Sequence, residues 1–423
     1  MKILWFTNTP CGATEKLKTN LHAGGWLKSL EDKLVEQKDI ELNICFYWNK
    51  ELAPFQFNKA TYYPILRTSS ETKIGRYTNR VFKTMYNDKK ETLKLLKVVE
   101  IVNPDLIHIH GTEDNFGLIQ SYTKIPVVIS IQGILSSCSE KFFSGIPFAS
   151  AYYYEKLTSK LFFRSVLFMH NDIDKRAKRE RLILSKANNI IGRTEWDKRI
   201  TRLLAPRSEY YIGNEILRSS FYEKQWNKEK LGNPVQIVTI MNESLYKGFE
   251  TIVKTILILS ENKSIDFNWT VVGINNSSNL VTVVKRMLGV NINSLPIKLI
   301  GNKSETEIVD ILLNSDFYCQ VSHIENSPNS LCEAMLLGMP IIASYAGGTC
   351  SMLENNKEGI LVQNGDSYSL AGAILESINN YDKAKLNGSY ARDRAIKRHN
   401  KDIIVDSLVS TYNHIINRQF IEG

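Results

Sequence analysis

Short apolar segments alternate with amphipathic segments along most of this chain, and this alternation constrains the fold more than any other feature. In the first half, strand-like apolar runs lie at residues 2–8, 41–47, 106–110, 127–131, 189–192 and 210–212. Between them, apolar residues recur at helical spacing, for example at Trp26, Leu30 and Leu34. Alternating strands and helices predict a parallel sheet that helices cover on both faces.

The second half of the chain repeats this pattern. Its strand-like runs lie at residues 235–240, 269–273, 297–301, 317–321, 341–344 and 359–362. Between the halves, residues 221–234 are polar and charged and end in Gly-Asn-Pro, which is typical of a linker. Helical stretches at 383–398 and 402–418 follow the last strand. We therefore expect an α/β protein with two doubly wound domains.

Charge is spread unevenly between the two halves. Residues 1–230 hold 37 Lys and Arg against 25 Asp and Glu, whereas residues 231–423 hold 16 against 19. This contrast indicates two domains with different tasks, the first of which faces an anionic partner. With 423 residues and ordinary apolar content, the chain is long enough for two or three hydrophobic cores.

The cysteines and the apolar runs bear on the compartment. The chain has six cysteines without Cys-x-x-Cys spacing, so we expect reduced thiols and neither a disulfide framework nor a zinc site. The N-terminal apolar run is too short for a signal peptide, and no run approaches the roughly 18 apolar residues that span a bilayer. We expect a cytoplasmic protein without a nucleic-acid partner.

The segment 323–335 carries two carboxylates eight positions apart, Glu325 and Glu333, on either side of a turn-forming Ser-Pro-Asn-Ser. The run 317–321 leads in as a buried strand, so Glu325 would lie at the carboxyl edge of a sheet, where such folds bind ligands. A helix starting at about Ser330 would point free N–H groups into the same crevice and could hold a diphosphate. Glu333 could accept two hydrogen bonds from a ribose diol. This arrangement indicates a nucleotide-sugar site.

A second interpretation of this segment is purely structural. Ser330-x-x-Glu333 is also a capping box, in which Ser330 caps the helix and Glu333 reaches back to the Ser330 N–H. Taken alone, Glu333 fits a cap better than a ligand contact. Capping does not explain Glu325, however, because it requires no second carboxylate before the turn.

The whole segment resembles the Glu-x7-Glu region of family 4 of the retaining glycosyltransferases. It has Glu-Asn-x-Pro-Asn at the front and Glu-Ala-Met-x-x-Gly-x-Pro behind. The resemblance implies the GT-B fold, in which two Rossmann-like domains face each other across a cleft. It assigns residues 1–225 to an acceptor-side domain and 226–400 to a nucleotide-sugar-binding domain. Residues 401–423 would form a C-terminal helix that crosses back to the first domain.

The resemblance also implies roles for residues of the second half. Glu325 would contact the hydroxyls of the donor sugar, Glu333 would hold the ribose, and Lys247 would lie against the diphosphate. Backbone amides around the start of the helix would share the diphosphate contact, at Ser327, Asn329, Ser330 and Leu331. The family usually has an arginine five residues before the lysine, and here Asn242 takes its place. This departure weakens the clamp or moves part of it to amides and another base, and a loop lysine is otherwise simply solvated.

Four residues of the first half are further candidates for the site. Gly24 and Gly25 resemble a glycine pair before the first helix, although any tight turn uses glycines. Gln132 stands where many relatives have a histidine that helps hold the transferred sugar; an amide can bond a hydroxyl but carries no titrating proton. Of two histidines on one strand, one is expected to be a core residue, and His110, at the strand end, is expected to face the crevice.

The implied reaction moves a sugar from a UDP- or GDP-linked donor to a saccharide or lipid-linked saccharide, with retention at the anomeric carbon. Surface polysaccharide biosynthesis is the expected setting. We expect no cofactor and no metal ion, because fixed groups would stabilise the leaving diphosphate. Glu325 and Lys247 are the expected catalytic residues.

Aromatic residues and bases interleave between Phe142 and Arg207. Ordinary core aromatics with a solvated basic helix explain this pattern, and so does a face that rests on an anionic membrane. In the second case the protein would lie peripherally on the inner face of the membrane.

Two other functions stay open. A sugar-nucleotide epimerase of the GT-B fold would bind the same diphosphate but needs no acceptor surface. A non-catalytic binding subunit would account for the replaced arginine and histidine. A Rossmann dehydrogenase is disfavoured, because the loop at residues 7–12 lacks Gly-x-Gly-x-x-Gly.

Overall fold

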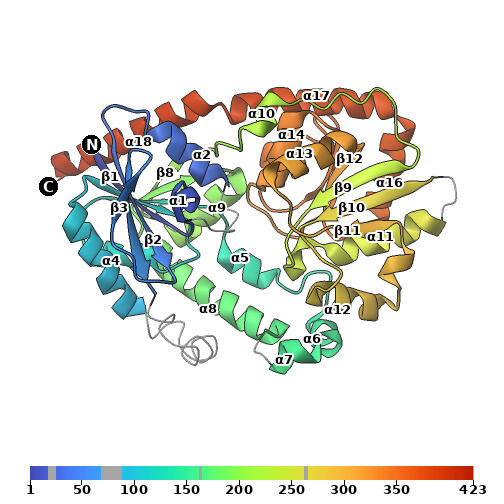
Figure 1. The fold of residues 1–423 in the computed structure, drawn as a ribbon, viewed down its shortest axis with the longest axis horizontal. Helices are drawn as coiled ribbons and strands as arrows, with labels where there is room; N and C mark the ends of the chain where they lie inside the picture. The colour runs from blue at the N-terminus through green and yellow to red at the C-terminus, as the bar shows by residue number, and fades with distance from the viewer. Residues whose placement is uncertain (18–24, 68–87, 162–163, 262–264, 423) are drawn as a thin grey trace. The chain divides into compact units, whose positions relative to one another are not determined.

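The structure is a computed structural model that describes residues 1–17, 25–67, 88–161, 164–261 and 265–422. The chain forms two compact units, and Figure 1 follows it from end to end in colour. Unit 1 comprises Met1–Ser136, Asn171–Leu217 and His399–Gly423, and unit 2 comprises Ser137–His170 and Arg218–Arg398. These units differ from the predicted bounds 1–225, 226–400 and 401–423, because residues 137–170 and 218–225 group with unit 2.

Unit 1 is built on an eight-stranded sheet in the order β3-β4-β2-β1-β5-β6-β7-β8. Its strands are β1 (Lys2–Thr7), β2 (Glu41–Trp48), β3 (Phe55–Phe57), β4 (Ala60–Leu66), β5 (Leu106–His110), β6 (Val127–Ser130), β7 (Asn189–Gly192) and β8 (Glu209–Ile212). Neighbouring strands are parallel except β3 and β4, which pair as an antiparallel hairpin. Asn58 and Lys59, both with positive φ, form its two-residue turn. The sequence pattern did not predict this hairpin.

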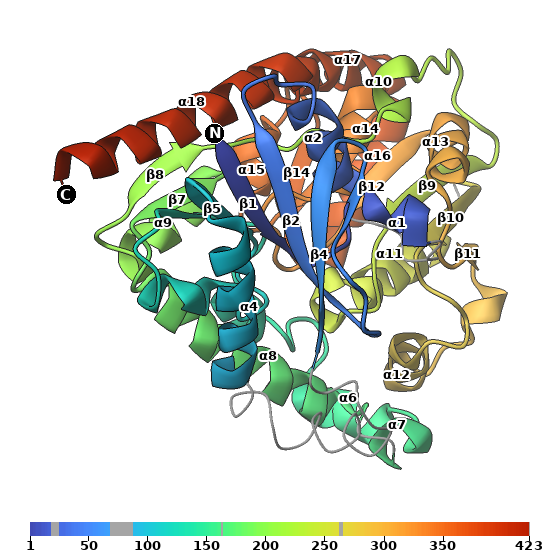
Figure 2. The same ribbon diagram turned by 60° about the vertical axis from the view of Figure 1, so that its left-hand side comes forward.

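Helices cover both faces of the unit 1 sheet, because successive residues of a strand point to opposite faces. The helices are α1 (Ala13–Leu17), α2 (Gly25–Leu34), α4 (Asp88–Val102), η2 (Phe116–Ser121), α9 (Glu195–Leu204) and α18 (Lys401–Glu422), with α5 (Leu135–Glu140) and α8 (Val166–Leu184) crossing the unit boundary. Ile3 and Trp5 of β1 share a core with α2 and α18, whereas Leu4 and Phe6 share one with α4. Figure 2 shows β1, β2 and β4 side by side with α4 beside them.

Helix α18, at the end of the chain, belongs to unit 1. Trp5 Nε1 donates a hydrogen bond to the Tyr412 hydroxyl at 3.0 Å, in a fully buried setting. The same hydroxyl lies 2.5 Å from His108 Nδ1, and His108 Nε2 lies 2.6 Å from Ser130 Oγ. His108 is therefore a core histidine with both ring nitrogens hydrogen-bonded.

Unit 2 is built on a six-stranded parallel sheet in the order β11-β10-β9-β12-β13-β14. Its strands are β9 (Val235–Ile240), β10 (Phe267–Val272), β11 (Ile297–Leu299), β12 (Phe317–Gln320), β13 (Ile341–Tyr345) and β14 (Ile360–Gln363). Its helices are α6 (Phe148–Tyr154), α7 (Leu157–Leu161), α10 (Ser220–Glu223), η3 (Leu245–Lys247), α11 (Phe249–Glu261), α12 (Asn279–Leu288), η4 (Ile292–Ser294), α13 (Glu305–Asn314), α14 (Asn329–Leu337), α15 (Thr349–Met352), α16 (Ser367–Asn379) and α17 (Tyr381–Arg398). Every residue of β12 is buried, as expected of a strand covered on both faces.

The strand pattern of the sequence predicted this architecture closely. Each strand-like run contains a strand whose bounds differ from the predicted ones by at most two residues at either end. Two parallel sheets interleaved with helices confirm the expected pair of doubly wound domains. Among the described residues, no helix is both long enough and apolar enough to cross a bilayer.

Candidate functional site

The two glutamates of the motif flank the turn between β12 and α14. Glu325 lies in the loop beyond the carboxyl end of β12, and α14 begins at Asn329, one residue earlier than predicted. The N-cap residue is Pro328, without a side-chain capping bond. The capping-box interpretation is therefore wrong, because Ser330 lies inside the helix and its hydroxyl donates to Gln320 Oε1 at 3.4 Å.

Lys247 and Glu325, the two residues expected to carry the chemistry, are in direct contact. Lys247 Nζ lies 2.5 Å from Glu325 Oε1, and the two side chains are 18% and 10% exposed. Lys247 ends η3, which follows β9, and β9 is the neighbour of β12 in the sheet. Because loops from adjacent parallel strands leave the same sheet edge, the two segments meet there.

Neighbouring groups fix the Glu325 carboxylate. Ser322 Oγ donates to Glu325 Oε1 at 2.7 Å, and Gln320 Nε2 donates to the same oxygen at 3.2 Å. The Gly348 N–H donates to the Glu325 carbonyl at 2.9 Å. Gly347, with φ of +54°, packs so closely that a Cβ would stand 2.0 Å from that carbonyl, which only glycine allows.

Lys247 is charged in this setting. Burial by itself lowers the pKa of Lys247, but the Glu325 charge and hydrogen bond outweigh it, so the pKa lies above its ordinary value. A lysine ammonium has three donors, of which the Glu325 contact uses one. The pair can therefore present a fixed positive group, the Lys247 ammonium, to an anionic ligand.

Glu333 has a partner that the sequence analysis missed. Arg218 Nε and Nη2 donate to its two carboxylate oxygens, each at 2.7 Å, in a bidentate pair. The Glu333 side chain is 4% exposed and that of Arg218 is 22% exposed. Burial raises the pKa of Glu333 and Arg218 opposes that shift. The Arg218 guanidinium also lies over the Phe221 ring, 4.8 Å from its centroid.

The start of α14 supplies some of the expected backbone donors. Leu331 N–H donates to the Pro328 carbonyl at 3.0 Å, so it is not available for a diphosphate. Among the described contacts, the N–H groups of Asn329 and Ser330 reach no acceptor, as is usual in the first turn of a helix. The Ser327 hydroxyl is buried and lies 4.0 Å from Cys332 Sγ.

Asn242, at the place of the family's arginine, serves its own loop. It is exposed, and its side-chain oxygen accepts a hydrogen bond from the Ser244 N–H at 3.0 Å. This bond orders the loop that leads to Lys247. Asn242 adds no positive charge, so Lys247 and the amides of α14 are the donors that this part of the site offers.

The candidates from the first half of the chain lie in unit 1. Gly24 lies outside the described residues, and Gly25 is the first residue of α2. Gln132 is half-buried and follows β6. Gly25 and Gln132 both belong to unit 1.

His110 is fully buried, contrary to the expectation that it faces a crevice. Its ring lies 4.5 Å from Trp5 and 5.8 Å from Trp26, centroid to centroid, and within the described part of the chain neither ring nitrogen has a hydrogen-bond partner. It lines a cavity of about 30 Å³ within unit 1. Burial lowers the pKa of His110 well below its ordinary value, and His108 and Arg193 add to the shift. The ring is therefore neutral.

One Asp-x-Asp tripeptide, which the sequence analysis overlooked as a candidate metal motif, lies on α8. Asp172 forms an ion pair with Arg176 at 3.7 Å, and Asp174 forms one with Lys178 at 2.8 Å. Each carboxylate is thus paired with the base one turn further along the helix. Neither carboxylate belongs to the unit that carries Glu325.

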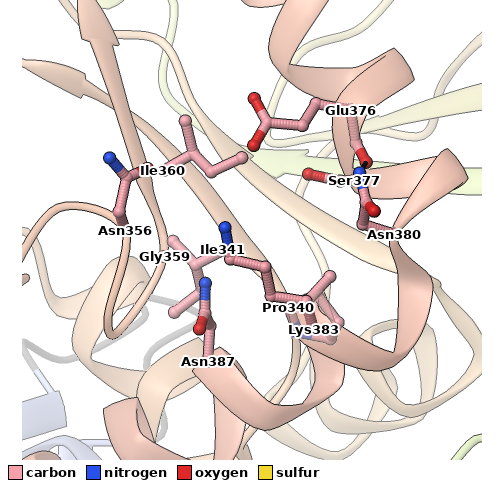
Figure 3. Close-up of a pocket in the computed structure, with 11 residues that line it drawn as sticks. Pro340, Ile341, Asn356, Gly359, Ile360, Glu376, Ser377, Asn380, Lys383 and Asn387 are labelled. Carbon is pink, nitrogen blue, oxygen red and sulfur yellow. Dashed lines mark hydrogen bonds between the residues drawn. The ribbon is translucent and has the colours of Figure 1, made fainter.

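A further cavity in unit 2 lies away from the motif. Figure 3 shows it between the start of β13, the strand β14 and helices α16 and α17, with Ile341, Asn356 and Glu376 among its lining residues. It holds about 20 Å³, room for one water molecule. Pro340 and Ile341 mark the amino end of β13, whereas Glu325 follows the carboxyl end of β12. The cavity is therefore not part of the candidate site.

Comparison with known sequences covers the segment that carries this geometry. Residues 221–394 match the family described as "Glycosyl transferases group 1". The amylovoran biosynthesis glycosyltransferase AmsK of Erwinia amylovora is 26% identical over 154 residues. That alignment covers 35% of this chain and 37% of the relative, so the similarity spans about a third of each protein. Lys247, Glu325 and Glu333 lie in the matched segment, and Arg218 lies three residues before it.

Solved structures share the fold over nearly the whole chain. A sucrose-phosphate synthase from Thermosynechococcus elongatus superposes with a TM-score of 0.71 at 15% identity, covering 99% of this chain and 100% of that one. Anabaena Alr3699/HepE, in complex with UDP and glucose, gives a TM-score of 0.63 at 16% identity, covering 98% and 99%. The fold is GT-B, as the resemblance implied.

Proposed function

We propose that this protein is a retaining glycosyltransferase that moves a hexose-type sugar from a nucleoside diphosphate to a saccharide or lipid-linked saccharide. The contact between Lys247 and Glu325, beyond the carboxyl ends of adjacent parallel strands, is the observation that carries this proposal. The match of residues 221–394 to group 1 glycosyl transferases supports it. Similar proteins are named for the biosynthesis of amylovoran, of capsular polysaccharide and, as a putative assignment, of colanic acid, which supports the expected setting.

In the proposed reaction the bond between the anomeric carbon and the diphosphate breaks, and the diphosphate leaves with the electron pair. Lys247 would neutralise part of the growing negative charge, because two of its three ammonium donors remain after the Glu325 contact. The N–H groups of Asn329 and Ser330, at the positive end of α14, would share this role. Glu325 would accept hydrogen bonds from the sugar hydroxyls and stabilise positive charge at the ring.

Glu333 would bind the ribose diol in this scheme, with Arg218 holding its carboxylate in place. Both carboxylate oxygens already accept from Arg218, yet each has a second lone pair for a hydroxyl donor. UDP is the first nucleotide to test, because HepE has been crystallised in complex with UDP and with UDP-glucose. GDP is the second, as the motif does not distinguish the bases.

A nucleotide panel tests the proposal directly. Thermal shifts with UDP, GDP, ADP and CMP should single out one base, and the matching sugar nucleotides should then be hydrolysed or transferred. Proton NMR of the product would show the donor's anomeric configuration if the reaction retains it. Activity should survive EDTA, since fixed groups stabilise the leaving group; loss with EDTA and rescue by manganese would contradict the metal-free scheme.

The same panel separates the two alternatives. An epimerase would change the sugar without an acceptor, and a non-catalytic subunit would bind the nucleotide yet show no turnover above a Glu325→Ala control. Either result would replace the proposed transfer.

We also propose a lipid-linked acceptor and peripheral contact with an anionic membrane, through one part of the segment between Phe142 and Arg207 in which aromatic residues and bases interleave. The bases expected to face the membrane on α8 are engaged elsewhere: Arg179 is buried and bonded to Asp88 and to the Glu113 carbonyl, and Lys178 is paired with Asp174. They are poor candidates for a membrane contact.

Helices α6 and α7 carry the better surface. No residue of α7 is buried, and Tyr153, Leu157 and Leu161 are each more than 60% exposed. Lys160 lies over the Tyr152 ring, 4.4 Å from its centroid. Exposed apolar side chains with bases beside them are typical of segments that rest on anionic lipid. We call residues 148–161 the α6–α7 surface.

A further inference from the structure

Two segments of unit 2 carry the proposed catalytic pair, and they are joined by a second pair. Residues 245–250 bring Lys247, and residues 321–325 bring Glu325. Glu250 lies three positions after Lys247, and His323 lies two positions before Glu325. Glu250 Oε1 lies 2.6 Å from His323 Nε2. The side chains of Glu250 and His323 are 0% and 4% exposed, so this pair is more deeply buried than the catalytic one.

Backbone contacts join the same two segments. The His323 N–H donates to the Tyr246 carbonyl at 2.8 Å. Gly248, with φ of +82°, packs on the Val321 carbonyl so closely that a Cβ would lie 2.2 Å from its oxygen. Together with the two side-chain pairs, these contacts fix the register of one segment against the other.

Two glycines enclose the Glu250–His323 pair. A Cβ on Gly145 would stand 2.0 Å from Glu250 Oε1 and 2.5 Å from His323 Nε2. A Cβ on Gly365 would stand 2.9 Å from His323 Cε1. Both glycines have positive φ, so any other residue would be strained as well as crowded. The glycines let the backbone close over the pair and exclude water from it.

The pair is also hydrogen-bonded locally. Thr251 Oγ1 donates to Glu250 Oε1 at 3.0 Å, and Asn364 Nδ2 donates to the His323 carbonyl at 3.1 Å. Among the described hydrogen bonds, none joins the Glu250 or His323 side chain to Lys247 Nζ.

We propose that Glu250 and His323 form a positioning pair for the donor site, which holds Lys247 and Glu325 at the separation that the reaction needs. This inference rests on the proposed function for its catalytic readout. Groups behind a site commonly orient the groups that act, and a misplacement of about 1 Å can cost on the order of 100-fold in rate. The loop that carries Glu325 has no helix or strand of its own, so it depends on such support.

The test compares pairs at the two ends of one strand. Glu250→Gln and His323→Gln remove the positioning pair beyond the carboxyl end of β12, and Gly145→Ala disturbs it by crowding without changing a charge. Asp316→Asn is the matched control: Asp316 is fully buried just before β12, 2.5 Å from Lys228 Nζ, and accepts from the Gln236 N–H at 2.7 Å. It supports the other end of the same strand.

All four variants should lower the melting temperature, but only the first three should lower kcat of the folded enzyme, by about tenfold to 100-fold. The preference for UDP over 2′-deoxy-UDP should stay unchanged, because the proposed ribose contact, Glu333, lies on α14. Equal kcat in the positioning variants and in Asp316→Asn would reduce Glu250 and His323 to a purely structural role and overturn the proposal.

A second readout does not depend on turnover. NMR titration of the Lys247 ammonium should show its pKa falling in Glu250→Gln and His323→Gln, because Glu325 would no longer lie against it, and staying raised in Asp316→Asn. If the wild type turns over no sugar nucleotide, the proposed function fails while this titration still tests the positioning pair. An unchanged Lys247 pKa in both variants would overturn the proposed positioning role of Glu250 and His323.

Discussion

Buried carboxylates near the expected site residues are held differently in the two units. In unit 2, Glu325 and Glu333 each face a base, Lys247 and Arg218. In unit 1, Glu31 of α2 is held by uncharged groups: the Gly12 N–H donates to it at 2.7 Å, and the Tyr62 hydroxyl donates to its other oxygen. Burial raises the pKa of Glu333 as well as that of Glu31; a charged donor, Arg218, opposes the shift at Glu333, whereas neutral donors oppose it at Glu31.

The consequence is a difference in titration. Burial raises the pKa of Glu31 to about 7, while the bonds from Tyr62 and Gly12 oppose the shift only in part. In unit 2, the Lys247 pKa is raised, so the lysine stays charged when Glu325 is ionised. Unit 2 therefore offers a fixed positive charge at Lys247, as binding of a diphosphate requires, and unit 1 offers a carboxyl that changes charge near neutrality.

The largest expected effect tests the charged side of this comparison. Lys247→Ala and Glu325→Gln should each lower turnover by roughly 100- to 1000-fold, because each removes a fixed group that stabilises charge in the transition state. The measurement is the rate of sugar-nucleotide hydrolysis or transfer. Lys303→Ala and Glu307→Gln provide the control, since that pair joins at 2.9 Å on the surface of unit 2. Equal losses in both sets would contradict the catalytic assignment.

The uncharged side of the comparison predicts a pH dependence of stability. The ordinary pKa of the Glu31 carboxyl is 4.5 and the folded value is about 7, so the folded protein binds more protons between these values. Stability from this group is present below about pH 4.5 and is lost as pH rises through 7, by about 3 kcal/mol. Glu31→Gln should remove this loss.

Melting temperatures between pH 5 and pH 8 check the Glu31 prediction. The gap between Glu31→Gln and wild type should widen in favour of the variant as pH rises. Glu36→Gln, with an exposed side chain just beyond α2, should follow the wild-type curve. Parallel curves for wild type and Glu31→Gln would show that neutral donors hold Glu31 ionised, and the contrast between the units would disappear.

The next prediction concerns the bidentate contact between Arg218 and the buried Glu333 carboxylate. Arg218→Ala and Glu333→Ala should each weaken UDP binding, by roughly tenfold to 100-fold, because hydrogen bonds to a charged group contribute about 1.5–3 kcal/mol. Arg218→Lys should restore little, since a lysine cannot make the bidentate contact. Calorimetry with UDP and 2′-deoxy-UDP adds a discriminating step: both Ala variants should lose the wild-type preference for ribose. A preserved preference would remove Glu333 from the ribose contact.

The sequence predicted the local part of the site and missed the distant part. Glu325, Glu333 and the start of α14 lie within 13 residues of one another, so spacing alone brings them to one sheet edge. Lys247 could be foreseen only through the family resemblance, which places a lysine in the loop after the first strand of this half. Arg218 precedes Glu333 by 115 positions and lies in no motif, so only the tertiary fold reveals the pair. A lone arginine next to the linker was the single available signal.

The same distinction explains the fold. Strands of buried parallel sheets are continuous apolar runs, and these were predictable. The β3–β4 hairpin was not, because β3 has only three residues and its turn uses Asn58 and Lys59 instead of a glycine pair. The grouping of residues 137–170 with unit 2 was also beyond prediction, since contacts such as that of Gly145 with Glu250 carry no local signal.

The smallest expected effect concerns the α6–α7 surface of unit 2, where the half-buried Lys160 lies beside the exposed Leu161. Lys160→Gln/Leu161→Gln on the α6–α7 surface should weaken sedimentation with anionic vesicles by about tenfold, since one base contributes about 1 kcal/mol and the exposed leucine adds apolar contact. Arg202→Gln/Leu203→Gln on α9 is matched in charge and in exposed leucine. Neutral vesicles and high salt should abolish binding of the wild type, because the attraction is screened. Equal losses in the two double variants, or no sedimentation of the wild type, would contradict the membrane contact and indicate a water-soluble acceptor. The charged groups of unit 2 would then bind only the nucleotide.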